Sequence, residues 1–297
     1  MTEKQTASRI GFNIVNYSFM VIFGVACFLP FWHVLMASIS DPRLLMNSSG
    51  LLLKPPGKIT FDGYKMVFQN KNIWTGYLNT LFYVLFSAVV GTIMTALAGY
   101  LISRKNFKAA KPLTLFIMFT MIFSAGTIPT YMVVRGLGML NTRWAILIPG
   151  LMNAYYIIIM KSAFEQLPPS FEESAKLDGA SPVEILFRIL LPMVKPTLVV
   201  IVMFTVIMQW NSWYPASIYL PRASEAWPLQ LYMRELLINN NVNKIVTSAD
   251  EANALVNMTG NLVKYCVTVV GTAPILMAYP FAQKYFVKGI TLGGVKE

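Results

Sequence analysis

The chain has 297 residues, of which 56% are hydrophobic and only 12% are charged, and its mean hydropathy is +0.55. Soluble domains carry about twice that share of charged residues, so the composition excludes an ordinary soluble globule and favours a lipid bilayer. A net charge of +11 would suggest nucleic-acid binding in a soluble protein. In a membrane protein, the Lys and Arg residues of loops more often contact lipid headgroups and set the orientation.

The cysteines and the first residues argue against a secreted, disulfide-linked domain. Cys27 and Cys266 both lie inside apolar runs, where a free cysteine behaves as a small hydrophobe, so no disulfide framework is indicated. A polar start, residues 1–9, precedes the first apolar run without a small-residue cleavage site and a mature soluble domain behind it. We therefore expect a retained first span and not a removed signal peptide.

Apolar runs along the chain predict a multi-pass helical membrane protein. A spanning helix needs about 20 mostly apolar residues, because about 30 Å of hydrocarbon is crossed at about 1.5 Å per residue. Six stretches qualify, of which the fourth is the shortest: about 14–37, 77–102, 112–134, 144–161, 190–212 and 264–287. They lack the alternation of a membrane barrel, so the predicted fold class is an all-α membrane protein with about six transmembrane helices.

The short link between the second and third predicted spans indicates the orientation. Its charged residues are all basic: Arg104, Lys105, Lys108 and Lys111. Short basic loops stay on the cytoplasmic side, so we expect this link, both termini and the polar segment near Glu173 to lie inside the cell. The outer segments are then 38–76, 135–143 and 213–263. The first of them also holds five basic residues, so the orientation depends in addition on the motif described below.

The outer segments are long, and long loops in compact proteins are usually functional or disordered. The first is expected to form a lobe that begins with Asp41-Pro42 and turns at Pro55-Pro56-Gly57. The second contains residues 247–254, which look helical.

A polar segment follows the fourth predicted span and begins a short helix. Residues 167–169, Leu-Pro-Pro, end the span because proline cannot continue a helix. Ser170 and Glu173 have the spacing of a capping box, in which each side chain bonds to the other's backbone N–H. Gly179 lies where a left-handed C-cap residue is expected, so the helix should end after about two turns.

The same segment then begins a second helix. Ser181-Pro182-Val183-Glu184 repeats the pattern of a cap, a proline at the first helical position and an acid at the third. A helix, a glycine bend and a second helix should therefore lie along the membrane surface, with Pro192 and Pro196 in the first turns of the fifth span. On these local features alone, a well-capped polar connector remains an open interpretation.

The longer spacing of this segment resembles a known family motif. Glu173-Ser174-Ala175, then Gly179, then Ile189 with Leu191-Pro192, is similar to the EAA–G–I–LP signature of ABC importer permeases. In that family the loop forms a short cytoplasmic helix that docks into a cleft of the ATPase, with the glutamate facing a basic residue there. The resemblance implies these ATPase-coupling residues: Glu172, Glu173, Ser174, Ala175, Asp178, Gly179, Ile189, Leu191 and Pro192.

The end of the chain carries a second resemblance. Residues 285–297 look like the tail of the G-type permease of maltose-type carbohydrate importers, which reaches toward the ATPase dimer interface. Gly293, Gly294 and Lys296 would make the tail contacts. The implied organisation is a cytoplasmic N-terminus over 1–13, a transmembrane permease domain over 14–287 with its coupling loop at 163–189, and a cytoplasmic tail over 288–297.

The resemblance implies a permease subunit of an ATP-driven oligosaccharide importer in the bacterial cytoplasmic (inner) membrane. Its partners would be a second homologous permease, two ATPase subunits, an extracytoplasmic solute-binding protein, the oligosaccharide and lipid, but no nucleic acid. The sequence contains no phosphate-binding Gly-x-x-x-x-Gly-Lys-Ser/Thr loop, so we expect no cofactor, metal or catalytic residue in this chain and place ATP and Mg on the partner ATPase.

Two other classes of transporter compete with this interpretation. A secondary transporter or channel would need no ATPase, but the spans hold few carboxylates for ion coupling, and for the single histidine, His33, we favour helix packing over a proton relay. An exporter subunit would lack the loop signature. If the chain, expressed with its neighbouring open reading frames, brings no ATPase along on purification, the importer interpretation fails.

Aromatic and amide residues gather near the expected outer ends of the spans and suit a sugar, because aromatic faces stack on sugar rings and amides bond hydroxyls. The substrate-path candidates are Tyr131, Asn153, Tyr155, Tyr156, Trp210, Asn211 and Trp213. An aromatic belt at the membrane interface is the alternative. Four arginines in the outer segments favour an acidic, uronate-type saccharide such as an alginate- or pectin-derived oligomer: Arg135, Arg143, Arg222 and Arg234. They could equally serve lipid headgroups or the binding protein.

Overall fold

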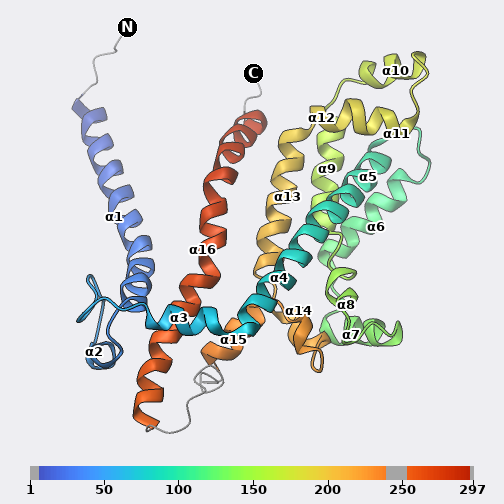
Figure 1. The fold of residues 1–297 in the computed structure, drawn as a ribbon. Helices are drawn as coiled ribbons and strands as arrows, with labels where there is room; N and C mark the ends of the chain where they lie inside the picture. Colours follow the sequence, from blue (N-terminus) through green and yellow to red (C-terminus); the bar gives the residue numbers. More distant parts are fainter. Residues whose placement is uncertain (1–6, 239–252, 295–297) are drawn as a thin grey trace. The chain divides into compact units, whose positions relative to one another are not determined.

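The computed structural model describes residues 7–238 and 253–294, and every regular element in them is a helix (Figure 1). The chain divides into two compact units. One comprises residues 1–71 with 233–272, and the other comprises residues 72–232 with 273–297. The predicted helix at 247–254 lies outside the described residues except for its last two, which begin α16 (Asn253–Gly294).

The first unit is built on α1 (Ala7–Ser38) and the first part of α16. Residues Ser8–Ser38 and Gly260–Pro280 are each long and apolar enough to cross a membrane, so the first and last predicted spans are confirmed as helices. The ring of His33 packs edge-on against Tyr265, with centroids 5.7 Å apart, while its Nδ1 accepts the backbone N–H of Leu52 at 3.1 Å. These contacts agree with the packing role expected for this histidine.

The lobe predicted after the first span is present in the first unit. Asp41 caps α2 (Pro42–Asn47), with the proline at the first helical position, and Gly57 turns with φ +80°. The lobe continues into α3 (Asp62–Gln69), where a Cβ at Gly63 would lie 2.6 Å from the sulfur of Cys266. This close approach explains why α3 carries glycine at the contact. Both cysteines are free.

The second unit holds most of the remaining helices. They are α4 (Lys71–Phe86), the π-helix η1 (Ser87–Gly91), α5 (Thr92–Ser103), α6 (Ala110–Ile122), α7 (Thr127–Gly136), α8 (Trp144–Leu147), α9 (Ala154–Glu165), α10 (Ser170–Leu177), α11 (Pro182–Glu184), the π-helix η2 (Ile185–Leu190), α12 (Leu191–Met193), α13 (Lys195–Trp210), α14 (Tyr214–Tyr219) and the 3₁₀ turn η3 (Ser224–Ala226). The helix α15 (Leu229–Ile238) is divided, with residues 229–232 in this unit and 233–238 in the first. From α4 through α5 the chain runs as one 33-residue helix, Lys71–Ser103, which confirms the second predicted span.

The third predicted span is not one continuous helix. α6 and α7 meet at a bend of 119°, so the expectation of a single helix over 112–134 is wrong. Gly126, just before α7, has φ +84° and ψ −179°, a conformation that is essentially restricted to glycine. The sequence is hydrophobic on both sides of the bend, so its hydropathy pattern gave no sign of the break between α6 and α7.

The fourth predicted span is also interrupted. The helix expected over 144–161 consists of the four-residue α8, a non-helical stretch over 148–153 that contains Pro149-Gly150, and the 12-residue α9. Twelve residues rise only about 18 Å, which is less than the thickness of the hydrocarbon layer. α9 contacts α5, α6 and α13, so it is packed among the other helices of this unit.

The fifth predicted span begins later than expected. The helical stretch Pro182–Met193 and α13 meet at 86°, with the bend at Val194. Pro196 lies in the first turn of α13 as predicted, whereas Pro192 lies before the bend in α12, so its assignment to the fifth span is wrong. Pro196 has no N–H to offer to a carbonyl of the preceding turn, which favours the break.

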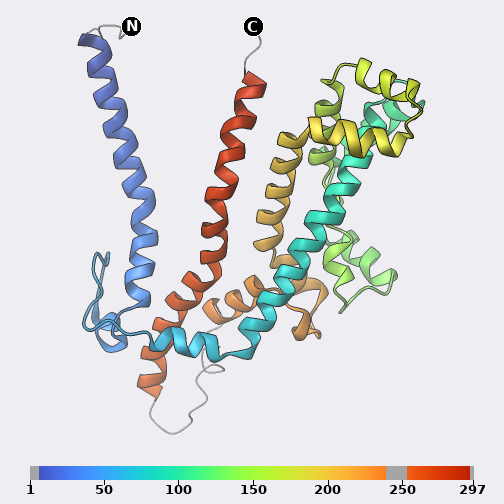
Figure 2. The same ribbon diagram turned by 45° about the horizontal axis from the view of Figure 1, so that its top comes forward.

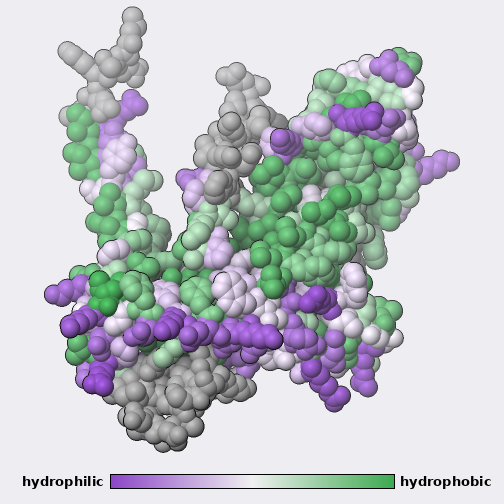
Figure 3. Space-filling model, viewed as in Figure 1, coloured by the Kyte–Doolittle hydropathy of each residue, from purple (hydrophilic) through white to green (hydrophobic). Residues whose placement is uncertain are grey.

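Counted by length and composition, the described helices provide three spans, or up to five if each bent pair is one span. In Figure 3 the surface of the second unit over α5 and α13 is mostly hydrophobic, and hydrophilic residues gather beyond its two ends. This banded surface fits the lipid interior with water on either side. The all-α membrane fold is therefore confirmed.

Different short helices lie at the two ends of the long helices of the second unit. In Figures 1 and 2, α10 and the α11–α12 segment lie at one end of α5, α9 and α13, while α7, α8 and α14 lie at the other. We refer to these as the α10 end and the α14 end.

At the α14 end, a buried amide organises the segment 225–227. Asn79 of α4 donates through Nδ2 to the carbonyls of Glu225 and Trp227 at 2.7 and 3.0 Å, and its Oδ1 accepts from Arg143 at 2.8 Å. The hydroxyl of Tyr83 donates to the carbonyl of Ala226 at 2.7 Å. Polar groups of α4 thereby fix the backbone of this part of the predicted outer segment.

Candidate coupling segment and cavity

The bend after α10 is a Schellman motif built on Gly179. This glycine has φ +78°, its N–H donates to the carbonyl of Lys176 at 3.1 Å, and the N–H of Ala180 donates to that of Ala175 at 3.0 Å. The predicted two-turn helix with a left-handed glycine cap is confirmed.

We expect Gly179→Ala to cost about 1 kcal/mol of stability, because an alanine is strained in the left-handed region. No atom lies within 4 Å of the position of the added Cβ, so the loss would come from the backbone alone. Thermal unfolding of the purified chain measures it, and Gly179→Asn, which tolerates this conformation better, should recover part of the loss. Equal stability of the alanine variant and the wild type would contradict the prediction.

The two predicted capping boxes differ in outcome. Ser181 and Glu184 form one: the Glu184 N–H donates to the Ser181 hydroxyl at 3.3 Å, and the Ser181 N–H donates to the Glu184 carboxylate at 3.1 Å. The box predicted for Ser170 and Glu173 is wrong. Here Pro169 is the cap residue, and its carbonyl accepts the Glu173 N–H at 3.1 Å, so the proline pair has already begun the turn before Ser170.

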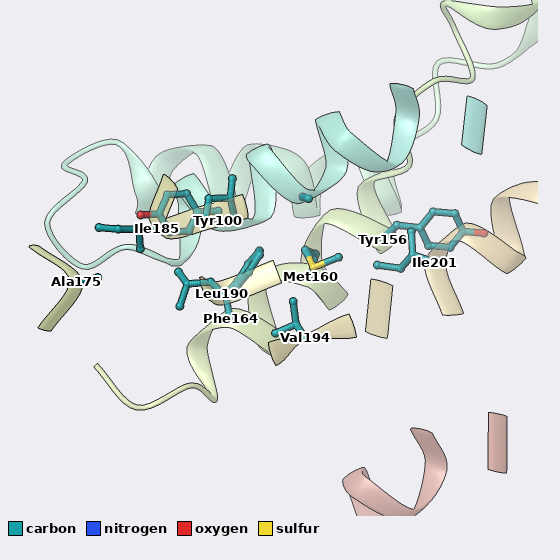
Figure 4. Packing of buried hydrophobic residues seen from close by; sticks show 11 residues of the cluster. Tyr100, Tyr156, Met160, Phe164, Ala175, Ile185, Leu190, Val194 and Ile201 are labelled. Atoms are coloured by element: carbon teal, nitrogen blue, oxygen red, sulfur yellow. The ribbon is translucent and has the colours of Figure 1, made fainter. Parts of the chain in front are cut away.

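One face of α10 is buried against the second unit. Ala175 is 5% exposed and belongs to a hydrophobic cluster with residues of α5, α9 and the α11–α13 segment (Figure 4). The buried members of this cluster are Ala96, Tyr100, Tyr156, Met160, Phe164, Ala175, Ile185, Leu186, Leu190, Val194 and Ile201. Ile189 and Leu191 of the signature pack against it, while Pro192 is exposed. The small residue at position 175 therefore lets α10 lie close to the bundle.

The opposite face of α10 is open. Glu173, Ser174 and Asp178 are exposed, and Leu177 is 89% exposed on the same helix. Val183, in the following helix, is 62% exposed. Apolar side chains presented by an otherwise polar segment are typical of a surface that binds a protein partner.

Glu172 points inward and makes two ion pairs. Its carboxylate pairs with Arg104 at the end of α5 and with Lys176 at 2.8 Å, and its side chain is only 13% exposed. Burial would raise the pKa of Glu172, but the hydrogen bond from Lys176 and the charge of Arg104 outweigh it and hold the pKa below 4.5, its ordinary value. The sequence did not predict the pair with Arg104, because Arg104 and Glu172 are 68 positions apart in the chain.

The lowered pKa of Glu172 predicts a pH-dependent stabilisation. The pKa of Glu172 is lower in the folded chain than in the unfolded chain. The ionised carboxylate therefore contributes fully to the free energy of unfolding above about pH 4.5, and this contribution is lost as the pH falls through the pKa of the folded state. We expect Glu172→Gln to lower stability by about 1 kcal/mol at pH 7 and by much less near pH 3. Thermal unfolding of both proteins across this range is the measurement, with Glu165→Gln as a control in an exposed pair. A difference that does not change with pH would contradict the assignment.

A cavity of about 290 Å³ lies toward the α14 end of the second unit. It is lined by Gly91, Thr95, Ala145, Ile146, Pro149, Gly150, Leu151, Asn153, Tyr156, Thr205, Met208, Gln209, Ser212, Pro215 and Tyr219. Its polar lining consists of amides, hydroxyls and backbone, with no charged side chain among these residues. Such a lining can hydrogen-bond hydroxyl groups but offers no counter-charge.

The predicted substrate-path residues divide around this cavity. Asn153 and Tyr156 line it, and Tyr131 stacks on Tyr219, which also lines it, with ring centroids 6.4 Å apart. Four others are not among its lining residues: Tyr155, Trp210, Asn211 and Trp213. Trp210 is 5% exposed and its ring lies 6.2 Å from that of Tyr77.

Sequence inspection missed Gln209, Thr95 and Thr205 as cavity residues. All three are polar groups inside otherwise apolar spans, which is the signal that could have identified them. Of the predicted tail residues, Gly293 and Gly294 form the end of α16, and Lys296 lies outside the described residues.

A membrane bundle with broken helices, a cavity that has uncharged polar groups in its lining, and a partly exposed helix–turn–helix at one end are the features of a membrane permease subunit. The chain belongs to the family of inner membrane components of binding-protein-dependent transport systems, whose model matches residues 96–291.

The relatives cover almost the whole chain. The polygalacturonan/rhamnogalacturonan transport system permease protein YtcP of Bacillus subtilis (strain 168) is 34% identical over 290 residues, which are 96% of this chain and 98% of that protein. A crystal structure of a bacterial ABC transporter involved in the import of the acidic polysaccharide alginate contains a chain that is 33% identical, with a TM-score of 0.86, covering 96% of this chain and 100% of that one.

A second alginate ABC transporter structure, in complex with an alginate pentasaccharide-bound periplasmic protein, supports the fold alone. Its matched chain is 16% identical, with a TM-score of 0.58 over 94% of this chain and 96% of that one.

Proposed function

We propose that this chain is a permease subunit of an ATP-driven ABC importer that carries acidic oligosaccharides across the cytoplasmic membrane. Membership of the binding-protein-dependent family supports the importer class, and the polysaccharides transported by YtcP and by the alginate transporter support a uronate-type substrate. The chain itself would be non-catalytic. ATP and Mg would be bound by two separate ATPase subunits, and a second permease and an extracytoplasmic binding protein would complete the assembly.

The exposed face of α10 is the proposed ATPase contact. Glu173 would meet a basic residue of the ATPase, and Leu177 would fill an apolar recess, because both project from the helix while its other face is held by the bundle. Closure of the ATPases on ATP would then move α10 and alternate access to the path between the permeases.

Co-purification tests the importer class. The tagged chain, expressed with its neighbouring open reading frames, should retain an ATPase and a second permease through gel filtration in detergent. If no ATPase is retained and substrate still enters vesicles that lack ATP, the chain works as a channel or secondary transporter.

The proposed orientation puts the α10 end in the cytoplasm. Arg104 of the basic link contacts Glu172 of α10, so the two segments that were assigned to the inside lie at the same end of the second unit. In intact cells, cysteines at Lys108 and Ala180 should resist an impermeant thiol reagent, whereas one at Arg222 should react. Each would be introduced with Cys27 and Cys266 replaced by serine. Labelling at Ala180 from outside would reverse the orientation.

The cavity is the proposed part of the substrate path within this chain. Gln209, Asn153 and Tyr156 would bond sugar hydroxyls, since their amides and phenol can donate and accept. Without a charged residue in the lining, the carboxylates of a uronate would be met elsewhere in the assembly.

Gln209→Ala should raise the substrate concentration for half-maximal transport by about 2- to 10-fold, because a neutral hydrogen bond contributes about 0.5–1.5 kcal/mol. Uptake of a labelled uronate oligomer into vesicles with the complete importer measures it. Asn211→Ala is the matched control, because Asn211 is a nearby amide outside the cavity lining. If Gln209→Ala and Asn211→Ala have equal effects on transport, the cavity is not part of the substrate path.

A further inference from the structure

Arg104 joins three helices at the α10 end. It is the C-cap residue of α5, and its guanidinium lies 4.8 Å from the centre of the Tyr100 ring in the same helix. It donates to the carbonyl of Phe164 in α9 at 3.5 Å and pairs with Glu172 in the first turn of α10. A single side chain therefore connects the proposed docking helix to both α5 and α9.

The pair is largely shielded from water. The side chains of Arg104 and Glu172 are 22% and 13% exposed, whereas in the neighbouring pair, Arg188 and Glu184, they are 79% and 46% exposed. Shielded, hydrogen-bonded charge pairs are costly to break, and exposed pairs contribute little. The second pair also lies within one continuous helical stretch and joins no separate elements.

α5 and α9 pack closely against each other at a glycine. A Cβ at Gly99 of α5 would lie 2.8 Å from the Cβ of Met160 and 3.0 Å from the backbone nitrogen of Lys161 in α9. Further along, a Cβ at Gly91 would lie 2.6 Å from the carbonyl oxygen of Leu151. Because glycine carries no side chain at these two positions, the neighbouring backbone approaches closely, and close-packed elements of this kind transmit displacement to one another.

The same helices reach the cavity. Gly91 and Thr95 line it from the η1–α5 side, and Asn153 and Tyr156 line it from the start of α9. A displacement of α10 that is carried by Arg104 would therefore reach the cavity wall through the α5–α9 pair.

We propose that Arg104 and Glu172 are positioning residues that transmit the movement of α10 to the α5–α9 pair and so to the cavity. The inference rests on the proposed docking of α10 to an ATPase. It differs from the docking itself, because Glu172 faces the bundle and acts through Arg104, while Glu173 and Leu177 remain available for the partner.

The experiment uses the complete importer reconstituted in proteoliposomes with the binding protein and a uronate oligomer. Its three readouts are retained ATPase, ATP hydrolysed and substrate imported. Wild type must first retain the ATPase; if it does not, the proposed function fails and not the transmission role. In Glu172→Gln and Arg104→Gln, we expect the ATPase to stay bound while substrate imported per ATP falls about tenfold.

The charge-exchanged double variant, Arg104→Glu with Glu172→Arg, restores the pair and should recover at least about a third of the ratio of import to hydrolysis. Arg188→Gln, in an exposed pair, and Glu165→Gln, whose own side chain is 45% exposed, should keep the wild-type ratio, because both pairs lie within one helical stretch. Wild-type ratios in both single variants would overturn the proposal. Loss of the ATPase in parallel with transport would also overturn it, because the pair would then support docking or folding. A double variant no better than either single one would exclude a role for the charge pair.

Discussion

We expect the substitution Glu173→Lys combined with Leu177→Asp to abolish retention of the ATPase and to lower transport by at least about 30-fold. Anchors at the centre of a protein interface contribute about 2–4 kcal/mol, and here one change places a like charge against the expected basic partner while the other puts a carboxylate into an apolar recess. Both side chains are exposed in this chain, so its own fold should be unaffected. Co-purified ATPase and uptake into vesicles are measured together.

Glu165→Lys is the control for this double substitution, because Glu165 is a 45% exposed glutamate outside α10. It should retain the ATPase. If the double variant retains the ATPase and transports normally, α10 is a capped polar connector and not a docking helix.

We expect the replacement Gly99→Leu to prevent α5 and α9 from packing and to lower the yield of folded chain. The new Cβ would lie 2.8 Å from Met160, and part of what it meets is the backbone of Lys161, which no rotamer change can move away. Overpacking of this kind costs about 1–3 kcal/mol or more. Gel-filtration profile and thermal unfolding in detergent measure the effect.

Gly136→Leu provides the matched control for Gly99→Leu, because no atom lies within 4 Å of the Cβ position at Gly136. It should leave the profile unchanged. A monodisperse, equally stable Gly99→Leu protein would show that α5 and α9 can separate. It would also count against the transmission of movement through the α5–α9 pair.

Local sequence patterns predicted the elements that local physics determines. The first, second and last spans follow from uninterrupted hydrophobicity, and Gly179 and the Ser181–Glu184 box follow from the requirements of a helix end. The predicted box at Ser170 failed because two adjacent prolines can themselves begin a helical turn, as the acceptance of the Glu173 N–H by Pro169 illustrates.

The breaks and the long-range contacts needed the structure. Hydrophobicity does not distinguish a straight helix from one that bends at Gly126, because both bury the same residues in lipid. The Arg104–Glu172 pair joins residues 68 positions apart, and a charge count identifies each as a polar loop residue without indicating its partner. The aromatic and amide pattern marked two members of the cavity lining, Asn153 and Tyr156, while their convergence on one cavity needed the structure.

The hydrogen bonds of Asn79 set an order of events during synthesis. This amide is made 146 residues before the carbonyl of Glu225 that it bonds. At about 5–20 residues per second, roughly 7–30 s pass before that partner emerges from the ribosome. During this interval α4 carries a polar group whose final partner does not exist, so it must be held by water, lipid headgroups or the insertion machinery. The newly made chain therefore completes its α14 end only after the segment 225–227 has been delivered.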